Sequence, residues 1–201
     1  TMYESDLLFA DVCLMQRFIT AGMRFSGHYR QRAGYREVKL TELEPAEVTP
    51  HFRVLSLDVE CAMDGELYSV ALLLREPDGR EISTVIMVGT AEPSEMNIEW
   101  VNNEYSLLLA LERWLLRHDP DIIIGWNVVN FDFRLLLRRA EFHKYPLRWG
   151  RGQSLMRWRP SRMDDQQGQL ILPGRMVIDG IDALKSATFR FDRFGLEYVA
   201  Q

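Results

Sequence analysis

The chain has 201 residues, of which 47% are hydrophobic, so it fits one domain, or one domain and a piece of another, and disorder is not expected. The longest apolar runs, such as residues 70–74, are too short to span a bilayer, and the first residues lack the pattern of a signal peptide. The two cysteines, Cys13 and Cys61, form no disulfide framework and indicate a reducing, cytosolic setting.

The net charge of −5 argues against a surface that is basic throughout, but the charge is unevenly distributed. Between Arg134 and Arg162 there are eight Arg and one Lys against a single Glu, and aromatic residues lie among them. Cations interleaved with aromatic rings suit single-stranded nucleic acid. The alternative is a solvated, Arg-rich helix face followed by a loop.

Residues 1–36 show no clear pattern, and the polar stretch 36–50 is interpreted as a connector, so a domain boundary is expected between residues 1–50 and 51–201. The second region contains regular elements in the order three strands, helix, strand, helix, irregular segment, strand, helix. The predicted ranges, in chain order, are strands 52–60, 67–75 and 81–88, helix 103–117, strand 122–124, helix 131–142, an irregular segment 146–172 in which short strands are possible, strand 175–178 and helix 179–189.

The turn Pro77-Asp78-Gly79 predicts that strands 67–75 and 81–88 form a hairpin. A meander that passes into alternating helix and strand gives a mixed sheet flanked by helices. The expected fold class is therefore α/β, and the ribonuclease-H-like architecture is one such solution.

Two acids on the first of these strands suggest a metal site. Asp58 and Glu60 are two residues apart, so both carboxylates lie on one face, whereas Leu57 and Val59 face the core. Adjacent carboxylates repel each other unless a cation lies between them, and Mg²⁺ and Mn²⁺ prefer oxygen ligands. The alternative is an exposed strand face, which is the common setting of Asp-x-Glu.

Asp132 is the natural third ligand, because it follows a short buried strand and begins a helix, whose N-terminus favours an anion. Asn127 and Asn130 either cap this helix or bind a ligand. Asp179 follows a strand and starts a helix, so a cap is its first interpretation and a neighbour of the site its second.

Several segments resemble family B DNA polymerases. Residues 57–60, Leu-Asp-Val-Glu, resemble the first exonuclease motif, and residues 125–132, Gly-Trp-Asn-Val-Val-Asn-Phe-Asp, resemble the second. Residues 174–201 are similar to the segment that follows, and residues 3–6 and 14–20 are similar to the N-terminal region of a bacterial member.

The resemblance implies a DEDD-type 3′→5′ proofreading exonuclease domain in which two Mg²⁺ or Mn²⁺ ions hydrolyse the terminal phosphodiester. Asp58 would bridge both ions, Glu60 would bind the first and orient the water, and Asp132 would hold the second. Asn127, Asn130 and Phe131 would contact the nucleic acid. The implied partners are a single-stranded 3′ DNA end, polymerase domains in cis and a sliding clamp, with a nucleoid-associated location and no membrane.

The family's third motif, a Tyr three residues before an Asp, is expected after Gln201, and no palm domain is present. The chain is therefore interpreted as a fragment, residues 1–50 from the polymerase N-terminal domain and 51–201 from the exonuclease domain, with weak or no nuclease activity. The alternatives are a free-standing exonuclease of this fold and an inactive nucleic-acid-binding or scaffold module.

Overall fold

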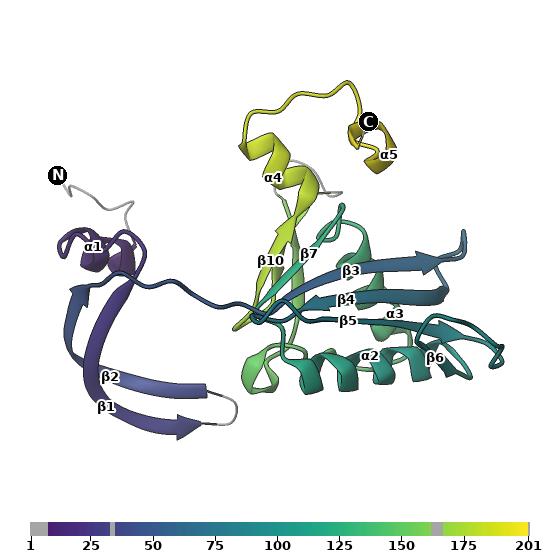
Figure 1. Cartoon of the computed structure of the whole chain (residues 1–201), viewed down its shortest axis with the longest axis horizontal. Helices are drawn as coiled ribbons and strands as arrows, with labels where there is room; N and C mark the ends of the chain where they lie inside the picture. The colour runs from purple at the N-terminus through teal and green to yellow at the C-terminus, as the bar shows by residue number, and fades with distance from the viewer. Residues whose placement is uncertain (1–7, 33–34, 162–166, 201) are drawn as a thin grey trace. The chain divides into compact units, whose positions relative to one another are not determined.

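The computed structural model describes residues 8–32, 35–161 and 167–200, arranged in two compact units, Thr1–His51 and Phe52–Gln201 (Figure 1). Three sequence observations fall outside the described residues: the resemblance at residues 3–6, the basic residue Arg162 and the residue Gln201. No helix in the described part is both long enough and apolar enough to cross a membrane.

The first unit contains a short helix and a hairpin. Helix α1 (Phe9–Met15) precedes two long antiparallel strands, β1 (Met23–Arg32) and β2 (Tyr35–Pro45). The interpretation of residues 36–50 as a connector is therefore wrong for most of its length. Nearly every residue of both strands is exposed, so the sequence shows no apolar alternation that would have revealed them.

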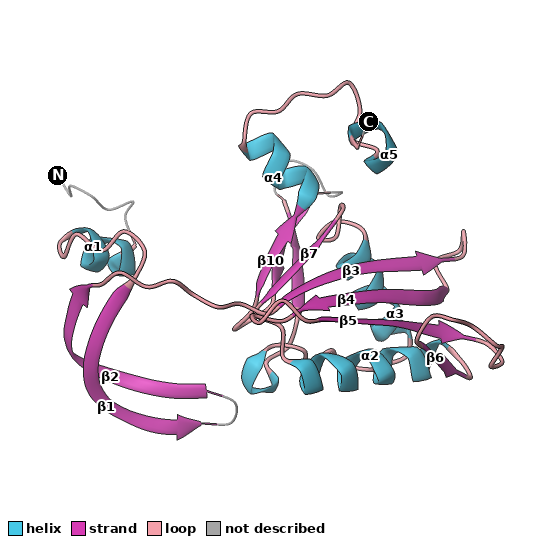
Figure 2. Cartoon of the chain, viewed as in Figure 1, coloured by secondary structure: helices cyan, strands magenta, loops and turns pink. Residues whose placement is uncertain are grey.

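The second unit is built on a six-stranded mixed sheet in the order β10-β7-β3-β4-β5-β6 (Figure 2). Strands β10, β7 and β3 run parallel, β3, β4 and β5 are antiparallel neighbours, and β6 is parallel to β5. The strands are β3 (Val54–Cys61), β4 (Leu67–Arg75), β5 (Glu81–Val88), β6 (Ile98–Val101), β7 (Ile122–Gly125) and β10 (Met176–Asp179). This mixed sheet, flanked by helices, confirms the expected fold class and is consistent with a ribonuclease-H-like domain. Strand β6 was not predicted.

Helices α2 (Glu104–His118) and α3 (Asp132–Phe142) pack on the same face of the sheet (Figure 1). Four leucines of α2 and alternate residues of β3 and β4 form one buried apolar core; the four are Leu107, Leu108, Leu111 and Leu115. Buried Glu104 joins the two helices: its carboxylate accepts two hydrogen bonds from Arg139, each 2.6 Å long, and one from the Leu67 amide. A buried acid is tolerated here because each of its oxygens has a partner.

The remaining elements lie between and after the last strands. The segment expected to be irregular contains the 3₁₀ turn η1 (Arg151–Gln153) and a small hairpin of β8 (Arg157–Pro160) and β9 (Gly168–Ile171). Helix α4 (Gly180–Ser186) follows β10 and ends three residues before the predicted limit, and α5 (Leu196–Val199) lies near the end of the chain.

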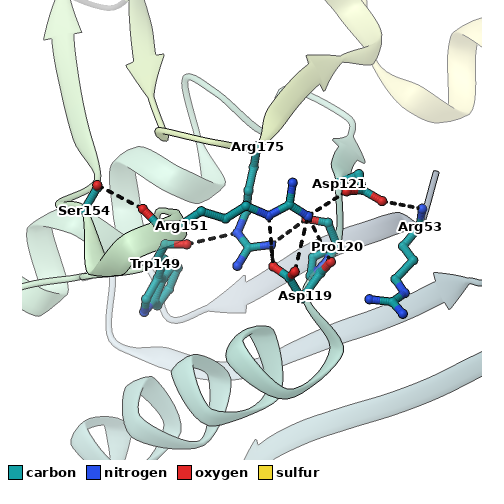
Figure 3. Close-up of polar contacts among 8 residues, drawn as sticks. All are labelled: Arg53, Asp119, Pro120, Asp121, Trp149, Arg151, Ser154 and Arg175. Atoms are coloured by element: carbon teal, nitrogen blue, oxygen red, sulfur yellow. Dashed lines mark hydrogen bonds and ion pairs between the residues drawn. The ribbon is translucent and has the colours of Figure 1, made fainter. Parts of the chain in front are cut away.

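An ionic network holds the amino ends of the parallel strands together (Figure 3). Asp121 accepts the Arg53 amide at 2.9 Å and an Arg151 guanidinium hydrogen bond at 2.6 Å. Asp119 pairs with Arg151 and, at 2.7 Å, with the buried Arg175 guanidinium. Burial acts to raise the pKa of both aspartates, but the arginine hydrogen bonds outweigh it and lower each pKa. The charges at this end are thus neutralised within the protein.

Candidate active site

The first two candidate acids lie side by side on β3. Leu57 and Val59 are buried, whereas Asp58 and Glu60 are exposed on the other face of the strand. This alternation confirms the predicted orientation of the four side chains and follows from the two-residue repeat of a strand.

Asp132 lies in the first turn of α3 and is only 2% exposed. Its Oδ1 accepts a hydrogen bond of 2.9 Å from the Val59 amide, which lies between the two acids on β3. This bond fastens the start of α3 to β3 and brings the Asp132 carboxylate within the electrostatic reach of Asp58.

Burial, together with the neighbouring charges of Asp58 and Asp179, raises the pKa of Asp132 to about 7, although the Val59 hydrogen bond acts in the opposite direction. An Asp with such a pKa loses its proton at a free-energy cost unless a cation arrives. The electrostatics of this carboxyl group therefore favour a cationic ligand.

Gly125 allows β7 and β3 to come close at this point. A Cβ atom on Gly125 would lie 2.7 Å from the Leu57 carbonyl oxygen and 2.8 Å from the Val128 side chain. Asn127, with a φ of 56°, then reverses the chain toward α3. The turn between the strand and Asp132 thus requires a residue without a side chain at position 125.

The two asparagines of the loop do not cap α3. Phe131 occupies the N-cap position, without a side-chain capping bond. The Asn130 side chain instead accepts the Gly168 amide at 2.8 Å and donates to Gln167 at 3.1 Å, which ties the loop to β9. The capping interpretation is therefore wrong for both residues. Phe131 is 45% exposed, and nucleic-acid contacts of Asn127, Asn130 and Phe131 stay a prediction.

Asp179, at the end of β10, is a fourth acid of this region and, like Asp132, is buried. Its Oδ1 accepts the Ile181 amide at 2.9 Å, which confirms that it caps α4. Its Oδ2 accepts the Val129 amide at 3.0 Å, a contact that was not predicted. Asp179 thus holds the β7–α3 loop from one side, while Asp132 holds it to β3 from the other. Its position beside Gly125 in the parallel register is the signal that could have indicated this contact.

Among the described residues, no ion pair involves Asp58, Glu60, Asp132 or Asp179, and no three His, Cys, Asp or Glu side chains converge closely enough to enclose a metal ion. Asp58 and Asp132 are coupled electrostatically, and Glu60 lies on the same face of β3 as Asp58. The donors fit a divalent ion in their chemistry, since carboxylates are hard oxygen ligands.

A cavity of about 550 Å³ lies over the open face of the sheet beside Asp58. Its walls come from β3, β4 and β5 and from the segment before β6, and they include Ala71, Leu73, Val85 and Met96. An apolar hollow next to a carboxylate provides room for a planar or hydrophobic group of a substrate.

Comparison with known proteins settles the family. Residues 34–199 match the model for the exonuclease domain of DNA polymerase family B. The chain belongs to this family. DNA polymerase II of Escherichia coli strain K12 is 37% identical over 206 residues, an alignment that covers 100% of this chain and 25% of that protein.

Catalytic subunits of DNA polymerase delta are also similar. The Drosophila melanogaster subunit is 33% identical over 113 residues, which cover 49% of this chain and 10% of that protein. The Oryza sativa subunit is 26% identical over 238 residues, which cover 98% and 21%. The chain therefore spans a quarter or less of the length of these relatives, and the resemblance to family B polymerases is confirmed at the level of the exonuclease domain.

Proposed function

We propose that Asp58, Glu60 and Asp132 form the metal-binding site of a 3′→5′ exonuclease domain that removes nucleotides from the single-stranded 3′ end of DNA. The observation that carries the proposal is the group of acids near the end of β3 and at the start of α3, which form no ion pair with any described residue, in a chain of the family B exonuclease domain. Exonuclease domains of this family use divalent metals, and Mg²⁺ and Mn²⁺ suit three carboxylates.

A divalent ion bound there would supply a water of lowered pKa and would stabilise the leaving 3′ oxygen. Asp132 has one oxygen committed to the Val59 amide, so Oδ2 is the atom left for a ligand. Asp58 adds the adjacent charge, and exposed Glu60 can rotate toward the same point at little cost. The protein's own contribution is to fix Asp132 by burial and to leave the two β3 acids accessible.

The substrate has a natural place beside these acids. The cavity next to Asp58 would take the terminal nucleoside, and exposed Phe131 offers a ring against which a base can stack. In the whole polymerase we propose further domains in cis and contact with a sliding clamp, in the bacterial cytoplasm at the nucleoid, because the substrate is chromosomal DNA.

Manganese titration of the metal-free chain, followed by electron paramagnetic resonance, tests the proposal without relying on turnover. We expect saturable binding that is lost in the Asp58→Asn/Glu60→Gln variant. The matched control, Asp78→Asn/Glu81→Gln, removes the same charge at the β4–β5 turn and should bind Mn²⁺ as the unchanged chain does. Equal binding by both variants would refute the site.

A nucleic-acid-binding module without catalysis is the second candidate, because the chain also carries the basic residues of α3 and β8. Binding of single-stranded DNA in EDTA that is unchanged when Asp58 and Glu60 become Ala, together with no Mn²⁺ binding, would favour this module over the exonuclease.

A further inference from the structure

The basic segment after Asp132 divides into two kinds of cation. Arg139 pairs with Glu104 and Arg151 with Asp121, each at 2.6 Å, so both stabilise the fold. Arg134 lies over the Trp158 ring, and Arg148 donates to the Gln153 carbonyl. Four further cations are exposed and form no ion pair with any described residue: Arg138, Lys144, Arg157 and Arg159. Charges that the fold does not use are available to a partner.

These four cations line one groove of about 1060 Å³ between α3, the loop after it and β8. The groove has an apolar floor, formed in part by Leu137, Leu147, Met156 and Trp158. Leu147 and Met156 are 2% and 3% exposed, so the floor is continuous with the core and rigid. A rigid apolar floor within a charged rim is typical of a surface that receives a protein side chain.

The charge around the groove is predominantly positive. Five basic residues line it, the four above and Arg134, against the single acid Glu141. An acidic ligand would therefore be attracted to the rim, and one with a large apolar side chain would also bury it on the floor.

The aromatic rings of the groove are already occupied, which argues against a nucleic-acid strand. The Arg134 guanidinium lies 4.5 Å from the centre of the Trp158 ring, and a Cβ on Gly168 would lie 2.2 Å from an atom of that ring. Tyr145 packs edge-on against Tyr105. Trp158 is therefore packed by Arg134 and Gly168, and Tyr145 by Tyr105, whereas stacking of bases on free ring faces supplies much of the affinity of single-strand binders.

We infer that this groove binds an acidic protein segment that carries a large apolar side chain such as Leu or Phe. The Asp and Glu side chains of the segment contact Arg138, Lys144, Arg157 and Arg159, and its apolar side chain lies on Leu137 and Met156. The groove is formed by the middle and the end of α3 and by β8, so it does not depend on the carboxylates at the start of the helix.

Selection of random peptides of about twelve residues on the immobilised chain tests this inference. We expect the selected peptides to be enriched in Asp and Glu around one Leu or Phe. The best peptide, fluorescently labelled, should bind about tenfold more weakly to the Arg138→Glu/Arg157→Glu variant. Arg117→Glu, an exposed reversal on α2 outside the groove, should change its affinity less than about twofold.

Three outcomes would overturn the inference: selected peptides without acidic enrichment, no selected peptide at all, or equal binding to the unchanged and charge-reversed chains. Displacement of the peptide by oligothymidine of about fifteen nucleotides, with the same dependence on Arg138 and Arg157, would assign the groove to DNA instead. Thermal melting followed by circular dichroism confirms that each variant is folded, and Arg159→Glu alone replaces the double variant if that one is not.

Discussion

The two ends of the parallel strands β3, β7 and β10 both carry aspartates, but only one end neutralises them. At the amino ends, Asp119 and Asp121 are bonded to arginines, and the pKa of each is lowered (Figure 3). At the carboxyl ends, Asp132 has no ionic partner among the described residues, and its pKa is raised to about 7. The same residue type thus has opposite electrostatic surroundings at the two ends of these strands, before β7 and at the start of α3.

This difference separates two acids whose charges are compensated by arginines from a buried acid that has no such partner among the described residues. A paired, hydrogen-bonded carboxylate stabilises the folded state, whereas a buried carboxylate beside other acids costs free energy when it ionises. Proteins retain such a cost chiefly at functional sites. The contrast supports the proposed metal site independently of the sequence motifs, and each of the following experiments tests one side of it.

The largest effect is expected from Arg175→Met at the amino ends. The Arg175 side chain is 2% exposed and donates to Asp119, to the Pro120 carbonyl and to the Trp149 carbonyl. Its removal leaves the carbonyl oxygens of buried Pro120 and Trp149 without this donor, whereas Asp119 is 44% exposed and keeps its bond to Arg151. We therefore expect the free energy of unfolding to fall by about 2–4 kcal/mol, measured by urea denaturation.

Arg113→Met is the matched control, because Arg113 also pairs with an acid, Glu99, but is 66% exposed. Loss of that pair should cost less than about 1 kcal/mol. If the two variants lost equal stability, the network at the amino ends would not be structural and the contrast between the two ends would fail.

The second effect has the opposite sign. Asp132→Asn removes a carboxyl group whose pKa is about 7 in the folded chain and about 3.9 in the unfolded chain. At alkaline pH, where the group is ionised in both states, this difference lowers the free energy of unfolding by at most ~4 kcal/mol. Asn keeps an oxygen for the Val59 amide but buries an NH₂ group. We therefore expect the metal-free variant to be about 1–3 kcal/mol more stable at pH 8.

Because the pKa of Asp132 is higher in the folded chain than in the unfolded chain, the stability gained by Asp132→Asn depends on pH. Below about pH 4 the Asp132 carboxyl group is protonated in both the folded and the unfolded chain, so the gain should vanish there. It should grow between about pH 4 and 7, as only the unfolded chain releases the proton. Urea denaturation in EDTA at several pH values measures this, and a variant less stable at pH 8 than the unchanged chain would contradict it.

Local pattern was sufficient for much of the fold. Strands β4 and β5 match their predicted limits because a tight turn separates two β-branched and apolar runs, and α2 follows from its leucine spacing. Strand β6 is only four residues long and pairs in parallel with β5, so no neighbouring turn marks it. Exposed β1 and β2 lack the alternation that sequence analysis detects.

The orientation of the candidate acids on β3 was predictable, but their environment was not. Alternation along β3 gave the direction of Asp58 and Glu60. The bonds that define the surroundings join residues far apart in the chain, Asp132 to Val59 and Asp179 to Val129. An Asp that begins a helix is usually exposed, so its burial could not be read from its position. The sequence motifs suggest a ligand, and the long-range contacts account for the burial that raises the pKa of Asp132.

A third, smaller effect concerns acid unfolding. Because the pKa of Asp119 and of Asp121 is lowered in the folded state, both contribute stability above about pH 4 and lose it as the pH falls further. The Asp119→Asn/Asp121→Asn variant should be less stable than the unchanged chain at pH 6 by about 1 kcal/mol, since both side chains are partly exposed. The free energies of unfolding of the variant and of the unchanged chain, plotted against pH, should converge below about pH 3. A difference that stays constant over the whole pH range would contradict a stabilising role of the ionised Asp119 and Asp121.

The smallest effect on stability, and the most specific, is expected from Asp58→Asn. Asp58 is exposed, so the free energy of unfolding should change by less than about 0.5 kcal/mol. Its charge is nevertheless one of the causes that raise the pKa of Asp132, so its removal should lower that pKa. The ¹³C chemical shift of the Asp132 carboxyl group, recorded against pH in the metal-free chain, measures this change. Glu81→Gln, at the start of β5, should leave the Asp132 titration where it is. If Asp58→Asn also left it unchanged, the two acids would not be coupled and could not share one cation.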